Sequence, residues 1–397
     1  MIKEKPSSRL QSIDALRGAA ALSVVVYHAL GSFPKFQISG IYSLTEYVVR
    51  SFFSFGYSGV YLFFVISGFC IHLQWVRAKV EKTDQKIEFT AFWKRRLWRL
   101  YPPYLFAVFL YLSLYALRGS LKIDSNFLID LGLHLTLLHN FTPTTCYSIN
   151  SAFWTLAIEE QLYLAYFLLL FLRIKFGWGK TLTICFSARV IWFIFCTFVQ
   201  SRFKVTIPLA EGALSHWFSW ALGAMGVEAF FGLTKLPKIS RNISVSIVSL
   251  AAAGSLTLLL PKISGLWHDL GWLILDPLWG VGFFALINWL AFSEDGWRRE
   301  LKLPLLIKHL ATVGIFSYSL YLTHQYLLLN AFLLKFIKLP SMLFSLFVIT
   351  PLAVGFAWVF FRYCEKPFIK TTSKKEPNKK GSENSLKLDY RNSAVNE

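Results

Sequence analysis

Long apolar segments recur along the whole chain and constrain its fold more than any other feature. Ten of them reach or approach the roughly 20 residues that an α-helix needs to cross a bilayer. Hydrophobic residues make up 55% of the chain and charged residues only 16%, whereas soluble domains carry about 25% charged residues. We therefore expect an all-α polytopic membrane protein with about ten transmembrane helices. The expected spans are residues 12–31, 55–75, 101–117, 154–172, 181–199, 213–231, 243–260, 269–291, 310–330 and 342–361.

The basic residues are distributed unevenly between the two sides of this arrangement. The chain has 41 Lys and Arg against 22 Asp and Glu, which gives a net charge of +19. With a cytoplasmic N-terminus, most Lys and Arg fall on the cytoplasmic side, as the positive-inside rule requires. We therefore expect both termini in the cytoplasm. The excess charge then indicates topology and contact with lipid headgroups rather than binding of nucleic acid.

Outside the expected membrane spans the sequence predicts no second folded domain. Residues 1–370 are expected to form one transmembrane domain, and residues 371–397 a polar, disordered tail. The first apolar run is expected to be a retained helix rather than a cleavable signal peptide. Of the five cysteines only Cys146 falls in an expected outside loop, so a disulfide framework is not expected. No cysteine has metal-ligand spacing, and we expect no metal site.

The first span carries charged and titratable residues that a membrane helix normally avoids. Arg17 and His28 are eleven residues apart, which places them on one helix face, separated by roughly 16 Å along the axis. Asp14 lies one turn before Arg17 and can pair with it. A histidine that is neutral near pH 7 suits a general base. The structural alternative is a histidine at the outer helix end and an interfacial ion pair between Asp14 and Arg17.

A cluster of guanidinium groups precedes the third span. Arg95, Arg96 and Arg99 follow Lys94 and come just before Pro102–Pro103. Arginine binds phosphate in a bidentate manner, so such a cluster at a helix end predicts a phosphate site. The alternative is a positive-inside anchor with neighbouring tryptophans in the aromatic belt.

Two adjacent carboxylates, Glu159 and Glu160, enter the outer half of the fourth span. Neighbouring residues on a helix point about 100° apart, so we expect one to face the bundle and the other the interface. Tyr163 is four residues after Glu159 and can contact it. A buried carboxylate orients a histidine or acts as an acid or base. The alternative is a solvated helix start, where the helix dipole favours acids.

The ninth span places Tyr321 and His324 three residues apart on one face, with His324 in the outer half as His28 is. In the second span, Ser67–Gly68 is small enough to let helices approach closely, so a packing role is expected there. Asp276 and Arg189 are intramembrane charges without an assigned partner and are second-tier site candidates.

The candidates divide by side of the membrane. Phosphate-binding groups fall at the inner face, whereas His28, Glu159, Glu160 and His324 fall in the outer half. This division suits a reaction whose charged donor docks from the cytoplasm and whose acceptor is reached across or within the membrane.

These motifs, in this order, match a known family. The chain resembles the membrane acyltransferase-3 family, whose members O-acylate carbohydrates and related acceptors. The resemblance covers nearly all of the chain except the tail. The matching stretches are IDALRGAAALSVVVYH, FFVISGF, FWKRRLWRLYP, FWTLAIEEQLY, YSLYLTH and RYCEKPF.

The resemblance implies roles for individual residues. His28 would be the catalytic residue, and Arg17 would help to position the donor or the acceptor. Glu159 and Glu160 match the motif carboxylates. Tyr326 stands where the family often has proline, two positions after His324, and this departure weakens the assignment of His324. The arginines that match the motif for coenzyme A phosphates are Arg95, Arg96 and Arg99.

The resemblance also implies the reaction. The protein would move an acyl group, most often acetyl, from cytoplasmic acyl-CoA to a hydroxyl of a cell-surface carbohydrate such as O-antigen, capsule or exopolysaccharide. Acyl-CoA is a donor substrate, and no permanently bound cofactor is expected. The expected location is the bacterial inner membrane. Some family members carry an additional soluble hydrolase-like domain, which no part of the 397 residues matches. We therefore expect this chain to deliver the acyl group to its acceptor without such a domain. The alternatives are a transporter or flippase of glycans or lipids, and a non-catalytic scaffold that leaves the histidines unexplained.

Overall fold

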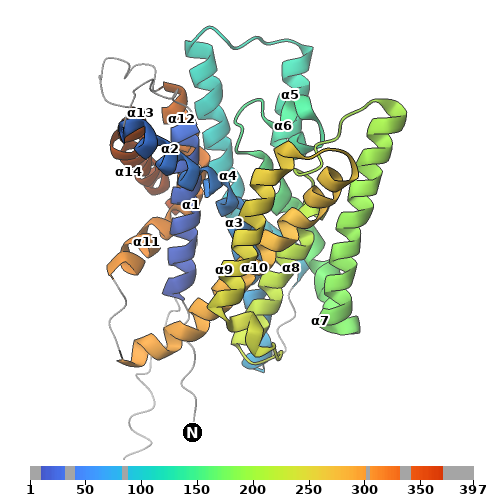
Figure 1. Ribbon diagram of the computed structural model, residues 1–397. Coiled ribbons are helices and arrows are strands. Elements are labelled where there is room, and N and C mark those ends of the chain that lie inside the picture. Colours follow the sequence, from blue (N-terminus) through green and yellow to red (C-terminus); the bar gives the residue numbers. More distant parts are fainter. Residues whose placement is uncertain (1–9, 32–40, 83–87, 301–304, 331–340, 370–397) are drawn as a thin grey trace, which may run out of the picture.

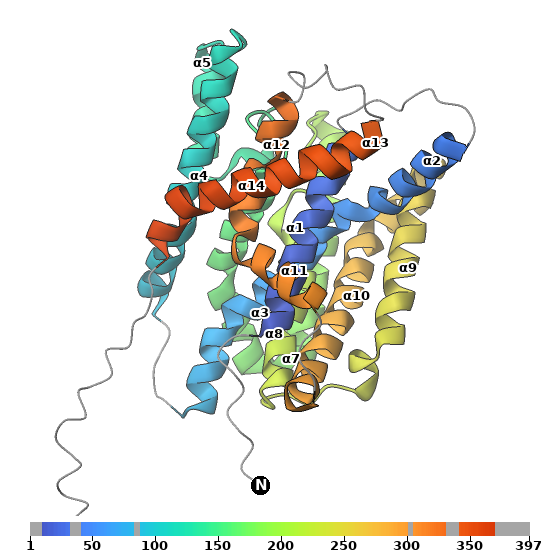
Figure 2. The same ribbon diagram turned by 90° about the vertical axis from the view of Figure 1, so that its left-hand side faces the viewer.

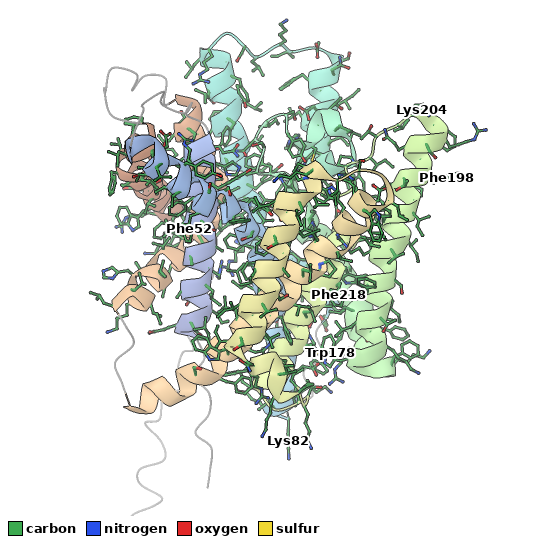
Figure 3. All side chains as sticks on the ribbon, in the orientation of Figure 1. Phe52, Lys82, Trp178, Phe198, Lys204 and Phe218 are labelled. Carbon is green, nitrogen blue, oxygen red and sulfur yellow. The ribbon has the colours of Figure 1, made fainter. Side chains whose placement is uncertain are left out.

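The structure is a computed structural model that describes residues 10–31, 41–82, 88–300, 305–330 and 341–369. Throughout these ranges the regular structure is helical, without a strand. The helices form a bundle with two ends (Figure 1). We call the end at which Lys82 lies the lower end, and the end at which Lys204 lies the upper end (Figure 3). The all-α membrane class is confirmed. The expected tail, 371–397, lies outside the described residues.

The helices follow one another along the chain with short connections. The first half comprises α1 (Gln11–Gly31), α2 (Ile41–Phe53), η1 (Ser54–Ser58), α3 (Gly59–Val80), α4 (Phe89–Leu117), α5 (Ser125–Leu135), η2 (His139–Phe141), α6 (Pro143–Cys146) and α7 (Trp154–Phe203). The second half comprises α8 (Ala213–Phe230), η3 (Lys238–Arg241), α9 (Ile243–Leu259), η4 (Leu260–Lys262), α10 (Gly265–Glu300), α11 (Leu305–Ile315), α12 (Ser317–Asn330), α13 (Ser341–Phe344), η6 (Ser345–Ile349), α14 (Thr350–Phe360), η7 (Phe361–Glu365) and η8 (Lys366–Phe368).

Every expected span coincides with helix. Within the described ranges, seven helices are long and apolar enough to cross a membrane, or eight if α11 and α12 form one broken span. One of the seven, α7, has 50 residues, or roughly 75 Å, which exceeds twice the bilayer core. It is interrupted at Gly177, whose φ of 73° suits glycine. Trp178 lies at the lower end and Lys204 at the upper end (Figure 3). The count of ten spans and the cytoplasmic termini stay predictions.

The arginine segment differs from the expectation. Instead of a helix that begins at residue 101, α4 is continuous from Phe89 to Leu117. The arginines therefore lie inside a helix and not at its end. Pro102–Pro103 lie within α4, and membrane helices tolerate proline because neighbouring groups bind the freed backbone oxygens. Beside them the Tyr318 hydroxyl donates to the Leu100 carbonyl oxygen at 2.8 Å.

The expected span 310–330 is two helices. The axes of α11 and α12 are bent by 77° at a break between Ile315 and Ser317. Figure 2 shows α11 and α12 on the same side of the bundle as α1 and α14. The bend lets α11 cross the lower half of α1 while α12 packs against α14 and the upper half of α1.

At two helix crossings each helix places a glycine against the backbone of the other helix, so that the two backbones touch. A Cβ atom on Gly18 of α1 would lie 2.0 Å from the Leu310 carbonyl oxygen of α11. A Cβ atom on Gly314 of α11 would lie 1.9 Å from the Asp14 carbonyl oxygen of α1. The crossing of α3 and α8 repeats the pattern. A Cβ on Gly68 would lie 1.9 Å from the Trp220 carbonyl oxygen. The expected packing role of Gly68 is confirmed, and close packing of this kind is typical of membrane helices.

We predict that Gly223→Ala destabilises the protein by about 1–3 kcal/mol, the usual cost of overpacking. Its Cβ would lie 1.9 Å from the Val65 carbonyl oxygen, so α3 and α8 would have to separate. The apparent free energy of unfolding, from SDS titration of the purified protein, measures the effect. Gly355→Ala is the matched control, because nothing lies within 4 Å of its Cβ position. Equal stability of the two variants would contradict the account.

Candidate active site

A cavity of about 120 Å³ lies inside the bundle between α1, α3, α4, α7 and α12. Its wall brings together groups that lie on separate helices and far apart in the sequence. Six of the predicted site residues line it: Arg17, Arg96, Arg99, Glu159, Tyr163 and Tyr321.

The cavity carries an unbalanced positive charge. Arg17 reaches it from α1, and Arg96 and Arg99 reach it from one face of α4. No carboxylate of the described residues lies within ion-pair distance of these three guanidinium groups. The Arg99 Nε atom is buried and has no hydrogen-bond partner among the same residues. Buried cations are costly unless an anion compensates them, so this wall is suited to an anionic ligand.

Arg95 does not belong to this wall. Its side chain is exposed, and its Nη2 donates a long hydrogen bond of 3.5 Å to Gln74 Oε1. The reason is helical periodicity, because Arg95 points about 100° away from Arg96 on α4. Of the three clustered arginines, the structure brings two to the cavity.

The two glutamates both face the interior. Glu159 lines the cavity and accepts a hydrogen bond of 3.2 Å from the Tyr163 hydroxyl, as the spacing predicted. Glu160 is buried, and its Oε2 has no hydrogen-bond partner in the described part of the chain. It lines a smaller cavity with Tyr104 and Tyr318. The expectation that one glutamate faces the interface is wrong, because α7 is packed against α8 and α3 as well as α4.

His28 and His324 form a pair between α1 and α12. The distance from His28 Nδ1 to His324 Nε2 is 3.1 Å. His324 Nδ1 faces the backbone oxygens of Tyr321 at 2.8 Å and Leu320 at 3.3 Å. Carbonyl oxygens only accept hydrogen bonds, so His324 Nδ1 carries the hydrogen and Nε2 accepts. His28 Nδ1 also faces the Val24 carbonyl oxygen at 3.0 Å. It therefore carries the hydrogen, which Val24 and His324 both accept, and the lone pair of neutral His28 lies on Nε2.

This pairing corrects the expected partner of His28. The side chain that the His28 ring bonds is His324 and not Glu159 or Glu160, because the upper half of α1 packs on α12. His324 is fully buried. The departure at Tyr326 leaves this pairing intact, since Tyr326 packs away from it in a stack with Phe356.

Tyr321 links the cavity to the histidine pair. Its ring lines the cavity, and its hydroxyl accepts a hydrogen bond of 2.9 Å from Thr155. The ring centroid lies 5.8 Å from that of His324. His28 and His324 do not themselves line the cavity. Asp14 also lies outside it, where α1 crosses Gly314 of α11. The expected ion pair between Asp14 and Arg17 is wrong, because no carboxylate of the described residues lies within ion-pair distance of Arg17.

The second-tier candidates Arg189 and Asp276 meet in a buried network that supports α10. Asp276 accepts hydrogen bonds from His216 Nδ1 at 2.6 Å and from Ser219 at 2.7 Å, and Arg189 Nη1 lies 4.0 Å away. Pro277 follows in α10 and cannot donate to the Leu273 carbonyl oxygen. Arg189 Nε donates there instead, at 2.8 Å. The network thus holds a proline kink.

A second buried network was missed from the sequence. Glu228 of α8 accepts from Arg173 Nε at 2.6 Å and Nη2 at 2.7 Å. It also accepts from His72 Nε2 at 2.8 Å and Trp178 Nε1 at 2.9 Å. These groups come from three helices, so no local spacing reveals them. The one available signal is a charged residue inside an apolar helix.

Two stacked histidines lie at the C-terminal end of α5 and at the start of η2. The rings of His134 and His139 are 4.0 Å apart and nearly parallel, and both side chains are buried. Burial is the main cause that lowers the pKa of His139, to about 3, and the neighbouring His134 lowers it further. This ring is therefore neutral at physiological pH and acts as packing.

Comparison with known proteins decides the family. The profile of the family described as Acyltransferase domain (Acyl_transf_3) matches residues 10–362. The chain belongs to the acyltransferase-3 family. The family assignment confirms the resemblance found in the motifs and places the arginine cavity and the histidine pair within one acyltransferase domain.

Two relatives of this acyltransferase illustrate the family. The peptidoglycan O-acetyltransferase OatA of Listeria monocytogenes is 31% identical over 180 residues, which cover 41% of this chain and 24% of the relative. The O-acetyltransferase OatA of Staphylococcus aureus is 28% identical over 165 residues, covering 40% and 24%. The matched part thus spans about a quarter of the length of these relatives. No solved structure matches the chain.

Proposed function

We propose that this acyltransferase is a membrane O-acetyltransferase that moves an acetyl group from acetyl-CoA to a hydroxyl of a cell-envelope carbohydrate. The observation that carries the proposal is the cavity wall that holds three arginines and one carboxylate, Glu159, with none of the arginines in an ion pair among the described residues. The relatives named O-acetyltransferases support acetyl as the group. The word peptidoglycan in the name of the Listeria relative favours a cell-wall glycan as the acceptor.

The donor docks through its phosphates. Guanidinium groups bind phosphate oxygens with strong, charge-assisted hydrogen bonds. A cavity of about 120 Å³ is too small for the whole coenzyme, so the arm that carries the thioester enters it and the nucleotide stays towards the lower end. The predicted topology places this end in the cytoplasm, where acyl-CoA is made.

His28 activates the acceptor. Its Nε2 lone pair removes the proton from the acceptor hydroxyl, and the oxygen attacks the thioester carbonyl. The new C–O ester bond forms as the C–S bond breaks, and the leaving thiolate takes the proton from His28. The products are the acetyl ester and coenzyme A thiol. His324 positions His28 by accepting the hydrogen on its Nδ1.

A two-step route uses the same atoms. His28 Nε2 would first attack the thioester and carry the acetyl group, and the acceptor hydroxyl would then take it. In either route Tyr321 lies between the donor cavity and the histidines.

We predict that Arg99→Ala raises KM for acetyl-CoA about 10- to 100-fold. A hydrogen bond to a charged group contributes about 1.5–3 kcal/mol, and each 1.4 kcal/mol is about tenfold in affinity. The rate of transfer of radiolabelled acetyl to the glycan fraction of native membrane vesicles, as a function of acetyl-CoA concentration, measures the effect. Arg95→Ala is the matched control and should leave KM unchanged, because Arg95 lies outside the cavity. Equal effects of the two changes would contradict the donor site.

Thermal stabilisation of the purified protein by coenzyme A separates this function from transport. The arginine cavity predicts a higher unfolding temperature at saturating coenzyme A, because the ligand binds only the folded protein. No shift with wild-type protein would favour a glycan or lipid transporter, which has no need of the coenzyme.

A further inference from the structure

A second cavity, which we call the upper groove, opens at the upper end of the molecule. Its volume is about 560 Å³, within the roughly 300–1,000 Å³ typical of ligand pockets. The groove lies between the C-terminal part of α4, the connection after it, α5 and the segment 144–149. Figure 1 shows this connection joining the upper ends of α4 and α5.

The lining of the upper groove differs in chemistry from the donor cavity. The donor cavity has three arginines, whereas the groove has one cation, Lys122, and one anion, Asp130. Asn126 and several hydroxyl groups add donors and acceptors without charge, and Tyr115 and Phe127 add aromatic rings. Sugar rings offer hydroxyls that both donate and accept, and C–H faces that pack on aromatic rings. The groove therefore suits a polyhydroxylated ligand rather than a phosphate.

The polar groups of the groove are held in place. Asp130 Oδ1 accepts a hydrogen bond of 2.9 Å from the Ser148 hydroxyl. The Tyr115 hydroxyl donates to the Ile149 carbonyl oxygen at 2.9 Å. Asp124 caps α5 by accepting from the Phe127 amide at 2.9 Å, which fixes where the helix begins. Such fixed groups lower the entropy lost on binding.

A short segment connects the groove to the histidine pair. Ser148 and Ile149 line the groove. Ser151 follows Ser148 by three residues, and its side chain donates a hydrogen bond of 3.0 Å to the Gln325 side chain. Gln325 directly follows His324. On α4, Tyr115 lies 16 residues beyond Arg99, or roughly 24 Å at 1.5 Å per residue. The groove is thus at the end of the bundle away from the donor arginines and next to the element that positions His28.

We infer that the upper groove binds the acceptor glycan and presents its hydroxyl towards His28. This inference rests on the proposed function, since it assigns the acceptor of that reaction. The acceptor enters from the upper end and the donor from the lower end, so the two substrates do not compete for one entrance.

A bulky label placed in the groove tests this directly. Ile129 lines the groove, is exposed and offers no polar group to a ligand. Ile129→Cys in the full chain is expected to keep transfer activity in freeze–thawed native membranes, which hold the natural acceptor and expose both faces. Reaction with a large maleimide should then reduce transfer of radiolabelled acetyl from acetyl-CoA to glycan at least tenfold, while coenzyme A still stabilises the protein against heat. Leu128→Cys is the matched control, since it is exposed on another face of α5 and does not line the groove. Its labelling should leave transfer unchanged.

The outcomes separate the two proposals. Full transfer after labelling of Ile129→Cys, or equal losses at both positions, would overturn the groove as the acceptor site. Absence of acetyl transfer by the unlabelled wild-type protein would instead overturn the proposed function. Wild-type protein treated with the maleimide accounts for the native cysteines, of which Cys146 in the upper segment is buried.

Discussion

Replacing His28 by alanine is expected to lower the rate of acyl transfer about 10²- to 10⁴-fold, the usual contribution of a general base. The variant loses the Nε2 lone pair that removes the acceptor proton. Binding of acetyl-CoA should persist, because the arginines that hold it lie in the cavity and His28 does not line it. The effect should therefore appear in kcat while KM for acetyl-CoA changes little.

Initial rates of radiolabelled acetyl transfer in native membranes measure this effect, with protein amounts matched by immunoblot. His309→Ala is the control, since His309 is an exposed histidine of α11 that bonds its own helix at Leu305. It should transfer at the wild-type rate. His324→Gln should fall between the two, because it removes one of the two acceptors that face His28 Nδ1 but leaves the base. Wild-type rates for His28→Ala would refute the assignment.

Replacing Glu228 by methionine is expected to destabilise the protein by about 3–5 kcal/mol. Removing one partner of a buried ion pair leaves the other uncompensated. Here the loss would strand the Arg173 guanidinium and the buried His72 ring, which both donate to Glu228. It would also release Trp178, the residue after the break at Gly177. The expected consequence is loosened packing of α7 against α8 at the lower end.

The double variant Arg173→Met/Glu228→Met tests whether the destabilisation arises from the stranded charge. Replacing both charges with apolar groups of similar size is often close to neutral, so the double variant should be more stable than Glu228→Met alone. Apparent unfolding free energies from SDS titration give the comparison. If the double variant is less stable than the single one, the cost does not arise from a stranded charge.

Much of the fold could be predicted from the sequence because membrane helices obey simple constraints. Each expected span coincides with helix, since apolar runs of this length have few alternatives in a bilayer. Helical periodicity placed Glu159 against Tyr163, and it also accounts for the exclusion of Arg95 from the cavity. The sequence could not show that α4 continues through Pro102–Pro103, because a proline is more often found at the first turn of a helix than in its interior.

The missed parts of the site depend on how helices meet. The partner of His28 lies 296 residues away, and nothing local in the sequence favours His324 over Glu159 as that partner. The networks around Glu228 and Asp276 likewise join separate helices. The glycines of the α1–α11 and α3–α8 crossings determine these meetings, but a glycine in an apolar run does not reveal its partner helix.

The central claim is that this protein esterifies a cell-envelope glycan through His28. Mass spectrometry of the surface glycans tests it most directly, in a deletion strain that carries the wild-type gene, the His28→Ala gene or no gene. The account predicts that one glycan bears the mass increment of an acetyl ester, removable by mild base, only with the wild-type gene. The same esterified glycan in the His28→Ala strain, or no difference among the three strains, would contradict it.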